Sequence, residues 1–209
     1  MKKFQVLIFG ASTTHGNWDE QGGWANRIRL YVIKKIFDNP SKLHGHVFNL
    51  GVPGDLTSDL LKRIEPEIKA RLFYPETIIL ISAGTNDSKI NFSDKKTLIS
   101  DEQFKDNVNK IIKIAKNFSD KVMFVGYTPV DEKRTNPWYD VAYLNERIKK
   151  FDNIVKSVCK ENAIPFLDLY SVFGSEDYLK YIYDGLHPNS SGHEKMFDLV
   201  KPYIDKFLE

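Results

Sequence analysis

The sequence predicts an α/β protein in which a parallel β-sheet is covered by helices on both faces. Short apolar runs alternate with longer stretches of helical period, and strand–helix alternation of this kind gives a parallel sheet. The runs are nearly all apolar, as expected for strands buried on both faces. The 209 residues contain no internal repeat, low-complexity linker or shift in composition. Residues 1–209 are therefore predicted to form one domain.

The first part of the chain supplies two strand–helix pairs. Residues 4–9 (FQVLIF) are a short, mostly apolar run and are predicted as the first strand. Residues 24–37 carry apolar side chains at helical spacing and are predicted as the first helix. Residues 46–50 and 57–72 repeat this order as a second strand and a second helix.

The middle of the chain contains the clearest strand, residues 77–82 (TIILIS). Residues 101–118 have apolar side chains along one helical face, and residues 121–127 form the next apolar run. Two polar stretches, 88–100 and 128–139, follow the third and fourth strands. These stretches are predicted to be functional loops, because binding residues are concentrated in such loops.

The last third of the chain is predicted to complete the sheet and cover it. A long helix is expected over residues 140–162, followed by a strand over residues 164–169. Pro165 interrupts this strand, which suits a position at the edge of the sheet. Residues 190–208 are predicted as a final helix that Pro202 kinks or restarts.

Charge, cysteine content and hydropathy exclude several classes of protein. The net charge is +2, with 30 basic and 28 acidic residues interspersed, so no nucleic-acid partner is expected. Cys159 is the single cysteine and lies in an apolar helical pattern, so it is interpreted as a small buried hydrophobic residue. Residues 1–9 imitate a secretory signal but are too short for one, and no apolar segment is long enough to span a membrane. We therefore expect a cytoplasmic protein.

Four polar motifs carry the chemistry, and each is predicted to lie where an apolar strand ends. They are Gly10-Ala11-Ser12, Gly51-Val52-Pro53-Gly54, Gly84-Thr85-Asn86-Asp87 and Asp184-Gly185-Leu186-His187. Parallel strands open their carboxyl ends on one edge of the sheet, where α/β proteins bind ligands. The motifs together supply a serine, a histidine, a carboxylate and two hydrogen-bond donors for an oxyanion. This set is what ester hydrolysis by a serine nucleophile needs.

Ser12 and His187 are the candidate nucleophile and base. Taken alone, Ser12 is better explained as a helix N-cap, and no G-x-S-x-G elbow or phosphate-binding loop surrounds it. Only His187 of the five histidines has an aspartate, Asp184, three residues before it. That carboxylate can fold back onto Nδ1 and orient the imidazole, although a plain exposed turn explains the same residues. The histidines are too scattered for zinc ligands, so no metal is expected.

Gly54 and Asn86 are the candidate oxyanion donors. A glycine at position 54 can present a bare backbone N–H to a ligand, and the side-chain amide of Asn86 could donate beside it. The alternatives are a turn glycine and an asparagine that holds its own turn. The coincidence of all four motifs in this order favours the catalytic interpretation over these alternatives.

With these four motifs in order, the sequence resembles the SGNH/GDSL hydrolase family of esterases and lipases over almost its whole length. The resemblance implies a flavodoxin-like three-layer α/β/α sandwich with five parallel strands in the order 2-1-3-4-5. It also implies that Ser12 is the nucleophile, that Asp184 and His187 complete a triad, and that the oxyanion donors are Ser12, Gly54 and Asn86. No cofactor is implied. Ala11 departs from the family, which usually has aspartate before the serine, so the bracing of this turn must differ.

The expected function is a serine esterase that hydrolyses a small or short-acyl carboxylic ester through an acyl-enzyme. A lysophospholipase- or thioesterase-type acyl hydrolase is the alternative enzyme, and a non-catalytic ligand-binding module on the same fold is the alternative of another class. Aromatic residues in loops, among them Trp18, Trp138 and Tyr143, could line the pocket for a small-molecule ester. The sequence gives no indication of the oligomeric state.

Overall fold

A five-stranded parallel sheet forms the centre of the computed structural model, which describes residues 1–175 and 177–209. Its strand order is β2-β1-β3-β5-β7. The strands are β1 (Lys2–Gly10), β2 (Leu43–Gly51), β3 (Glu76–Ser82), β5 (Lys121–Val125) and β7 (Phe166–Leu167). Numbered by these five strands alone, the order is 2-1-3-4-5, which confirms the predicted topology, with β7 at an edge.

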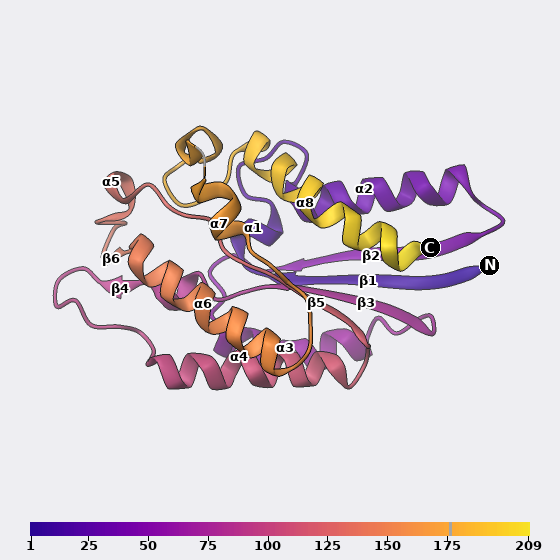
Figure 1. Ribbon diagram of the computed structural model, residues 1–209, viewed down its shortest axis with the longest axis horizontal. Helices are drawn as coiled ribbons and strands as arrows, with labels where there is room; N and C mark the ends of the chain where they lie inside the picture. Colours follow the sequence, from indigo (N-terminus) through magenta and orange to yellow (C-terminus); the bar gives the residue numbers. More distant parts are fainter. Residues whose placement is uncertain (176) are drawn as a thin grey trace.

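Helices cover both faces of the sheet and form three layers (Figure 1). The helices α2 (Gly23–Asp38) and α8 (Ser190–Leu208) pack on one face, over apolar side chains such as Val6 and Ile8. The opposite face, which includes Leu7 and Phe9, is covered by α3 (Thr57–Lys69), α4 (Asp101–Lys116) and α6 (Asn145–Glu161). Successive residues of a strand point to opposite faces, so the continuous apolar runs of the sequence supply both cores.

A small second sheet joins the predicted functional loop 88–100 to the segment that directly follows loop 128–139. In it β4 (Ile90–Asn91) pairs antiparallel with β6 (Val141–Ala142). The helix predicted over residues 140–162 was therefore wrong at its start, because residues 141–142 pair as β6 and α6 begins at Asn145. The other short elements are α1 (Ser12–His15), η1 (Asn86–Ser88), α5 (Glu132–Thr135), α7 (Leu169–Gly174) and η2 (Tyr178–Tyr181).

The last helix, α8, is continuous through Pro202, so the predicted restart does not occur. Apolar residues on both sides of the proline, Val200 and Ile204, are fully buried, and their packing offsets the hydrogen bond that proline removes from the helix. Cys159 is buried in the core, which confirms its interpretation as a hydrophobic residue. Among the described residues, every helix is too short or too polar to cross a lipid bilayer.

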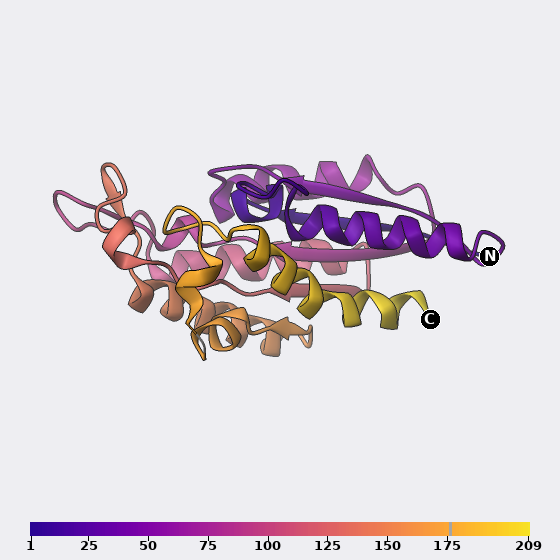
Figure 2. The same ribbon diagram turned by 90° about the horizontal axis from the view of Figure 1, so that it is seen from above.

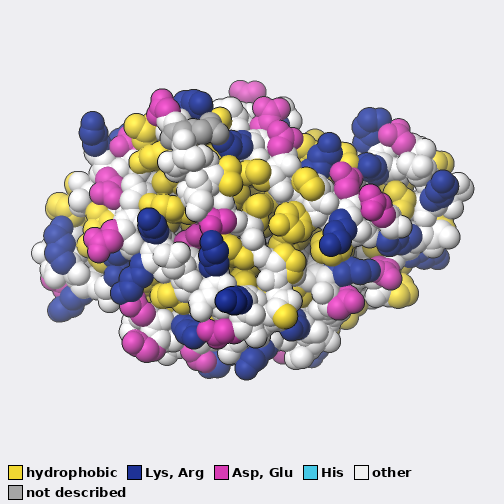
Figure 3. Space-filling view, in the orientation of Figure 1, with side chains coloured by type: hydrophobic (Ala, Val, Ile, Leu, Met, Phe, Trp, Pro, Cys, Tyr) yellow, Lys and Arg dark blue, Asp and Glu magenta, His cyan; other side chains and the backbone are white. Residues whose placement is uncertain are grey.

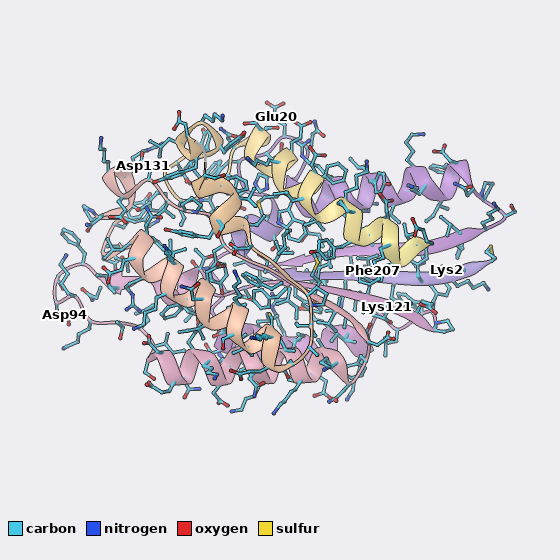
Figure 4. All side chains as sticks on the ribbon, viewed as in Figure 1. Lys2, Glu20, Asp94, Lys121, Asp131 and Phe207 are labelled. Atoms are coloured by element: carbon cyan, nitrogen blue, oxygen red, sulfur yellow. The ribbon has the colours of Figure 1, made fainter. Side chains whose placement is uncertain are left out.

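The parallel strands direct all their carboxyl ends to one end of the molecule, as the view from above also indicates (Figure 2). Lys2, Lys121 and Phe207 mark one end, and Asp94 and Asp131 of the two loops mark the other (Figure 4). At that second end Gly10 pairs with Gly51 of β2 and with Ser82 of β3. Three of the polar motifs therefore begin at or just beyond the same row of paired residues in the sheet. On the face in Figure 3, acidic and basic side chains are interspersed.

Candidate active site

Ser12 lies directly beyond the end of β1, where the chain turns sharply into the short helix α1. A side chain at Gly10 could not be accommodated here, because a Cβ atom would lie 2.5 Å from the carbonyl oxygen of Ser82. This close approach of backbone to backbone allows the turn and leaves the Ser12 side chain half-buried at the sheet edge. Ser12 Oγ lies 2.8 Å from His187 Nε2.

Asp184 and His187 form a tight turn that holds the imidazole in place. The two residues form a hydrogen bond of 2.7 Å between His187 Nδ1 and Asp184 Oδ2. The other carboxylate oxygen accepts hydrogen bonds from the backbone N–H groups of Leu186 and His187, at 3.0 and 2.8 Å. Burial opposes ionisation of Asp184, but the hydrogen bonds from His187 outweigh it and lower the pKa of the carboxyl to about 2. The carboxylate is therefore available to stabilise an imidazolium.

The predicted functional loop 128–139 supports this turn from outside. The backbone N–H of Asp131 donates to the carbonyl of Gly185 at 2.8 Å, and Arg134 Nη1 donates to the carbonyl of Tyr183 at 2.7 Å. The ring of Trp138 lies edge-on to the ring of His187, with centroids 6.3 Å apart. The loop thus braces the Asp184–His187 turn, a contact that no local sequence pattern signals.

Asn86 faces Ser12 and His187 across the same pocket. Its side chain is buried and joins two other loops: Nδ2 donates to the carbonyl of Asp55 at 3.0 Å, and Oδ1 accepts from the Tyr143 hydroxyl at 2.9 Å. Gly54, next to Asp55, is exposed with φ +88° and does not line the pocket. Its connection to the site is through Asp55, and its part in an oxyanion hole stays a prediction.

Arg63 of α3 connects the loops that carry Ser12 and Gly54, and sequence reasoning missed it. Its guanidinium lies 2.7 Å from Asp55 Oδ2 and donates to the carbonyl oxygens of Leu50 and Gly10, at 3.0 and 3.1 Å. The side chain is only 17% exposed. Because Ala11 has no polar side chain to brace the turn that carries Ser12, this contact to Gly10 holds the turn from the neighbouring helix. A single arginine inside an amphipathic helix gives no signal of such a role.

The pocket between these groups is lined mainly by small side chains. Beside Ser12, Asn86 and His187, the lining residues are Ala11, Thr13, Ser82, Gly84, Thr85, Gly126, Tyr127, Thr128, Leu186 and Met196. Within the part of the chain that the structure describes, no three His, Cys, Asp or Glu side chains are arranged to hold a metal ion.

The rim near the Asp184–His187 turn carries a pair of exposed aromatic rings. Trp18 and Tyr183 stack with centroids 5.3 Å apart and are 54% and 56% exposed. Trp18 has φ +66°, a left-handed conformation that disfavours bulky residues. The adjacent residues hold it there: the Asn17 carbonyl lies 3.2 Å from the ring of buried His193, and Asp19 forms a buried ion pair with Arg27.

The arrangement is suited to acyl transfer. A serine hydroxyl is hydrogen-bonded to an imidazole, the imidazole is hydrogen-bonded to a half-buried carboxylate, and an amide side chain lines the same pocket. This is the order of contacts by which a weak nucleophile is activated and oriented.

Comparisons with known proteins also indicate acyl hydrolysis. A model of the GDSL-like lipase/acylhydrolase family matches residues 8–195. An isoamyl acetate-hydrolyzing esterase 1 homolog from Homo sapiens is 25% identical over 216 residues, covering 97% of this chain and 82% of that protein. A GDSL esterase/lipase from Arabidopsis thaliana is 22% identical over 198 residues, covering 90% of this chain and 73% of that protein.

Two solved structures illustrate the likeness in fold. A lipase/acylhydrolase from Enterococcus faecalis has a TM-score of 0.73 and 25% identity, with 97% of this chain and 95% of that chain covered. The acetylxylan esterase Axe2 from Geobacillus stearothermophilus has a TM-score of 0.69 at 19% identity, with 96% and 93% covered.

Proposed function

This chain belongs to the GDSL-like lipase/acylhydrolase family and is a carboxylic ester hydrolase, and on that premise we propose that Ser12, His187 and Asp184 are its catalytic triad. The observation that carries the proposal is the unbroken series of contacts from Ser12 Oγ to His187 Nε2 at 2.8 Å and from His187 Nδ1 to Asp184 Oδ2 at 2.7 Å. Each group is within the hydrogen-bond reach that proton transfer requires.

The proposed reaction has two acyl-transfer steps. Ser12 Oγ attacks the ester carbonyl carbon while its proton passes to His187 Nε2, and the carbonyl electron pair moves onto oxygen. When the tetrahedral intermediate collapses, the bond to the leaving alcohol breaks and His187 gives that alcohol its proton. Water then attacks the acyl-enzyme with His187 again as base, which releases the acid and restores Ser12. Asp184 stabilises the imidazolium in both steps.

We propose that the oxyanion is held by the backbone N–H groups of Ser12 and Gly54 and by the side-chain amide of Asn86. Donors fixed before the reaction stabilise the charge that develops on the carbonyl oxygen. Asn86 lines the pocket together with Ser12, and its link to Asp55 ties it to the loop that contains Gly54.

We propose a short acyl group, acetyl above all, as the acid part of the substrate. The small side chains of the pocket, such as Ala11, Ser82 and Gly84, leave little apolar surface for a long chain. The human relative is described as an isoamyl acetate-hydrolyzing esterase homolog, which is consistent with a short acyl group. The exposed Trp18–Tyr183 pair offers an apolar surface for the alcohol part.

Hydrolysis of p-nitrophenyl esters from acetate to palmitate, by wild type and Ser12→Ala in parallel, tests the proposal. We expect the highest kcat/KM on acetate or butyrate and no turnover above background in Ser12→Ala. Ser157→Ala, on the exposed side of α6, is the matched control and should keep wild-type rates. Equal rates in wild type and Ser12→Ala would remove Ser12 as the nucleophile.

The chain-length profile separates the alternatives. A maximum at long chains would favour a lysophospholipase-type acyl hydrolase, and a preference for acyl thioesters would favour a thioesterase. Absence of turnover together with absence of labelling of Ser12 by a fluorophosphonate would favour a ligand-binding module.

We further propose that residues 1–209 form one hydrolase domain, of which the family model covers residues 8–195. The cytoplasmic location stays a prediction.

A further inference from the structure

The side-chain amide of Asn86 has a different partner at each end. Its nitrogen faces the carbonyl oxygen of Asp55 at 3.0 Å and its oxygen faces the hydroxyl of Tyr143 at 2.9 Å. A carbonyl oxygen can only accept a hydrogen bond, so the amide nitrogen must be the end that faces Asp55. The Asn86 oxygen is then free to accept from Tyr143, and the second N–H of the amide has no acceptor among the described residues.

Tyr143 is held firmly at this position. It is 3% exposed, and burial raises the pKa of its hydroxyl to about 12, so the hydroxyl keeps its proton and acts as a donor. Its backbone is fixed by the buried Thr135, which accepts from the Tyr143 N–H at 3.0 Å and donates through Oγ1 to the Tyr143 carbonyl at 2.9 Å. The irregular segment between β6 and α6 therefore places the Tyr143 hydroxyl within hydrogen-bond distance of the Asn86 side chain.

We propose that Tyr143 is a positioning residue that fixes the orientation of the Asn86 amide and so keeps its free N–H directed at the reacting carbonyl oxygen. The inference rests on the proposed function, in which Asn86 donates to the oxyanion. Tyr143 does not line the pocket, so it acts through Asn86 and not on the substrate. Rotation of the amide by 180° would place its oxygen against the Asp55 carbonyl and would remove the donor from the oxyanion hole.

The expected consequence is specific to the transition state. A donor to the oxyanion is needed most when charge develops on the carbonyl oxygen, so its misplacement lowers kcat and leaves KM nearly unchanged. A loss of general packing would instead lower the melting temperature and the amount of active enzyme, without any dependence on Asn86.

A double-mutant cycle on the best p-nitrophenyl ester tests this inference. We expect Tyr143→Phe, which keeps the buried ring, to lower kcat by about tenfold, and Asn86→Ala to lower it by about 10²–10³. In the Asn86→Ala background, Tyr143→Phe should have no further effect on kcat. Tyr170→Phe is the matched control, because its half-buried hydroxyl donates to the carbonyl of Asn145 at 3.3 Å, away from Asn86; it should keep the wild-type kcat.

The outcomes separate this inference from the proposed function. Wild-type kcat in Tyr143→Phe, or a full additional loss of kcat in the Asn86→Ala background, would overturn the role of Tyr143. The proposed function would still stand if turnover depends on Ser12. If Ser12→Ala keeps wild-type turnover, the proposed function and this inference both fail. Should Tyr143→Phe not fold, Thr135→Val loosens Tyr143 without removing its hydroxyl. The same loss of kcat is expected, and it should again disappear in the Asn86→Ala background.

Discussion

The two halves of the proposed active site are held in different ways. In the half with Asp184 and His187, the carboxylate, the imidazole and two backbone donors all belong to one turn, with partners at most three residues apart. In the half with Asn86 and Gly54, the contacts join residues far apart in the chain: Asn86 and Asp55 are 31 positions apart, and Tyr143 and Asn86 are 57 apart. The first half is a local structure, whereas the second exists only once the sheet has assembled.

This difference has a consequence for the effect of substitutions. The hydrogen bonds that define the Asp184–His187 turn lie within its own four residues, while loop 128–139 braces it from outside. The turn is therefore damaged mainly by changes of its own residues. In a half built from distant contacts, substitutions of residues that touch no substrate, such as the buried Tyr143 and the half-buried Arg63, also affect the site. Preorganised donors are sensitive to this, since small displacements reduce the stabilisation of the transition state.

The largest effect is expected from the local half. Asp184→Asn should lower kcat by about 10⁴-fold, because an amide no longer holds the imidazole in the required tautomer or stabilises its cationic form. The measurement is steady-state hydrolysis of p-nitrophenyl acetate. Asp198→Asn, on α8 outside the site, serves as the control. A loss of less than about tenfold would show that the turn is not the half that drives proton transfer.

The second effect is expected at the centre of the distant half. Asn86→Ala should lower kcat by about 10²–10³, or about 3–4 kcal/mol of transition-state stabilisation, with a small change in KM. Kinetics on acetate esters of different alcohols should give the same factor for each, because the lost donor serves the carbonyl oxygen and not the alcohol. A factor that varies strongly with the alcohol would place Asn86 in substrate binding instead.

The third effect tests the contact between the loops. Arg63→Met keeps the aliphatic stem but removes the guanidinium that joins Asp55 to the carbonyls of Gly10 and Leu50. We expect kcat to fall by about tenfold and the free energy of unfolding to fall by about 1–3 kcal/mol, since buried acceptors lose a charged donor. Lys62→Met, on the same helix and largely exposed, controls for the loss of a positive charge and should change neither quantity.

The same contrast explains what the sequence could predict. The order of strands and helices follows from the apolar periodicity, and the Asp184–His187 pair follows from a spacing of three residues in one turn. The contacts of Tyr143 and Arg63 do not follow, because they depend on which loops the sheet order brings together. The start of α6 was placed five residues early for the same reason: the helical pattern near residue 140 is overridden by pairing of Val141–Ala142 with a strand 50 positions earlier in the chain.

The smallest effect concerns the stability of the two halves at different pH values. Hydrogen bonds lower the pKa of Asp184 to about 2, so its contribution to stability is present above about pH 4 and is lost only as the pH falls toward 2. In the other half, burial outweighs the hydrogen bonds from Thr57 and raises the pKa of Asp87 to about 6. The native state therefore binds this proton more tightly than the unfolded state, and stability falls as the pH rises from about 4 to 6.

Urea unfolding at pH 4.5 and 7 of wild type and Asp87→Asn measures the contribution of Asp87. Between these pH values Asp184 is ionised in both the native and the unfolded state, so its own titration does not contribute to the wild-type pH dependence. Asp87→Asn should remove a decrease on the order of 1 kcal/mol, whatever its overall stability, because the amide does not titrate. If Asp87→Asn and wild type lose the same stability over this range, the Asp87 carboxyl is already ionised in the native protein. The half of the site built from distant contacts would then contain a stabilised carboxylate, as the Asp184–His187 turn does.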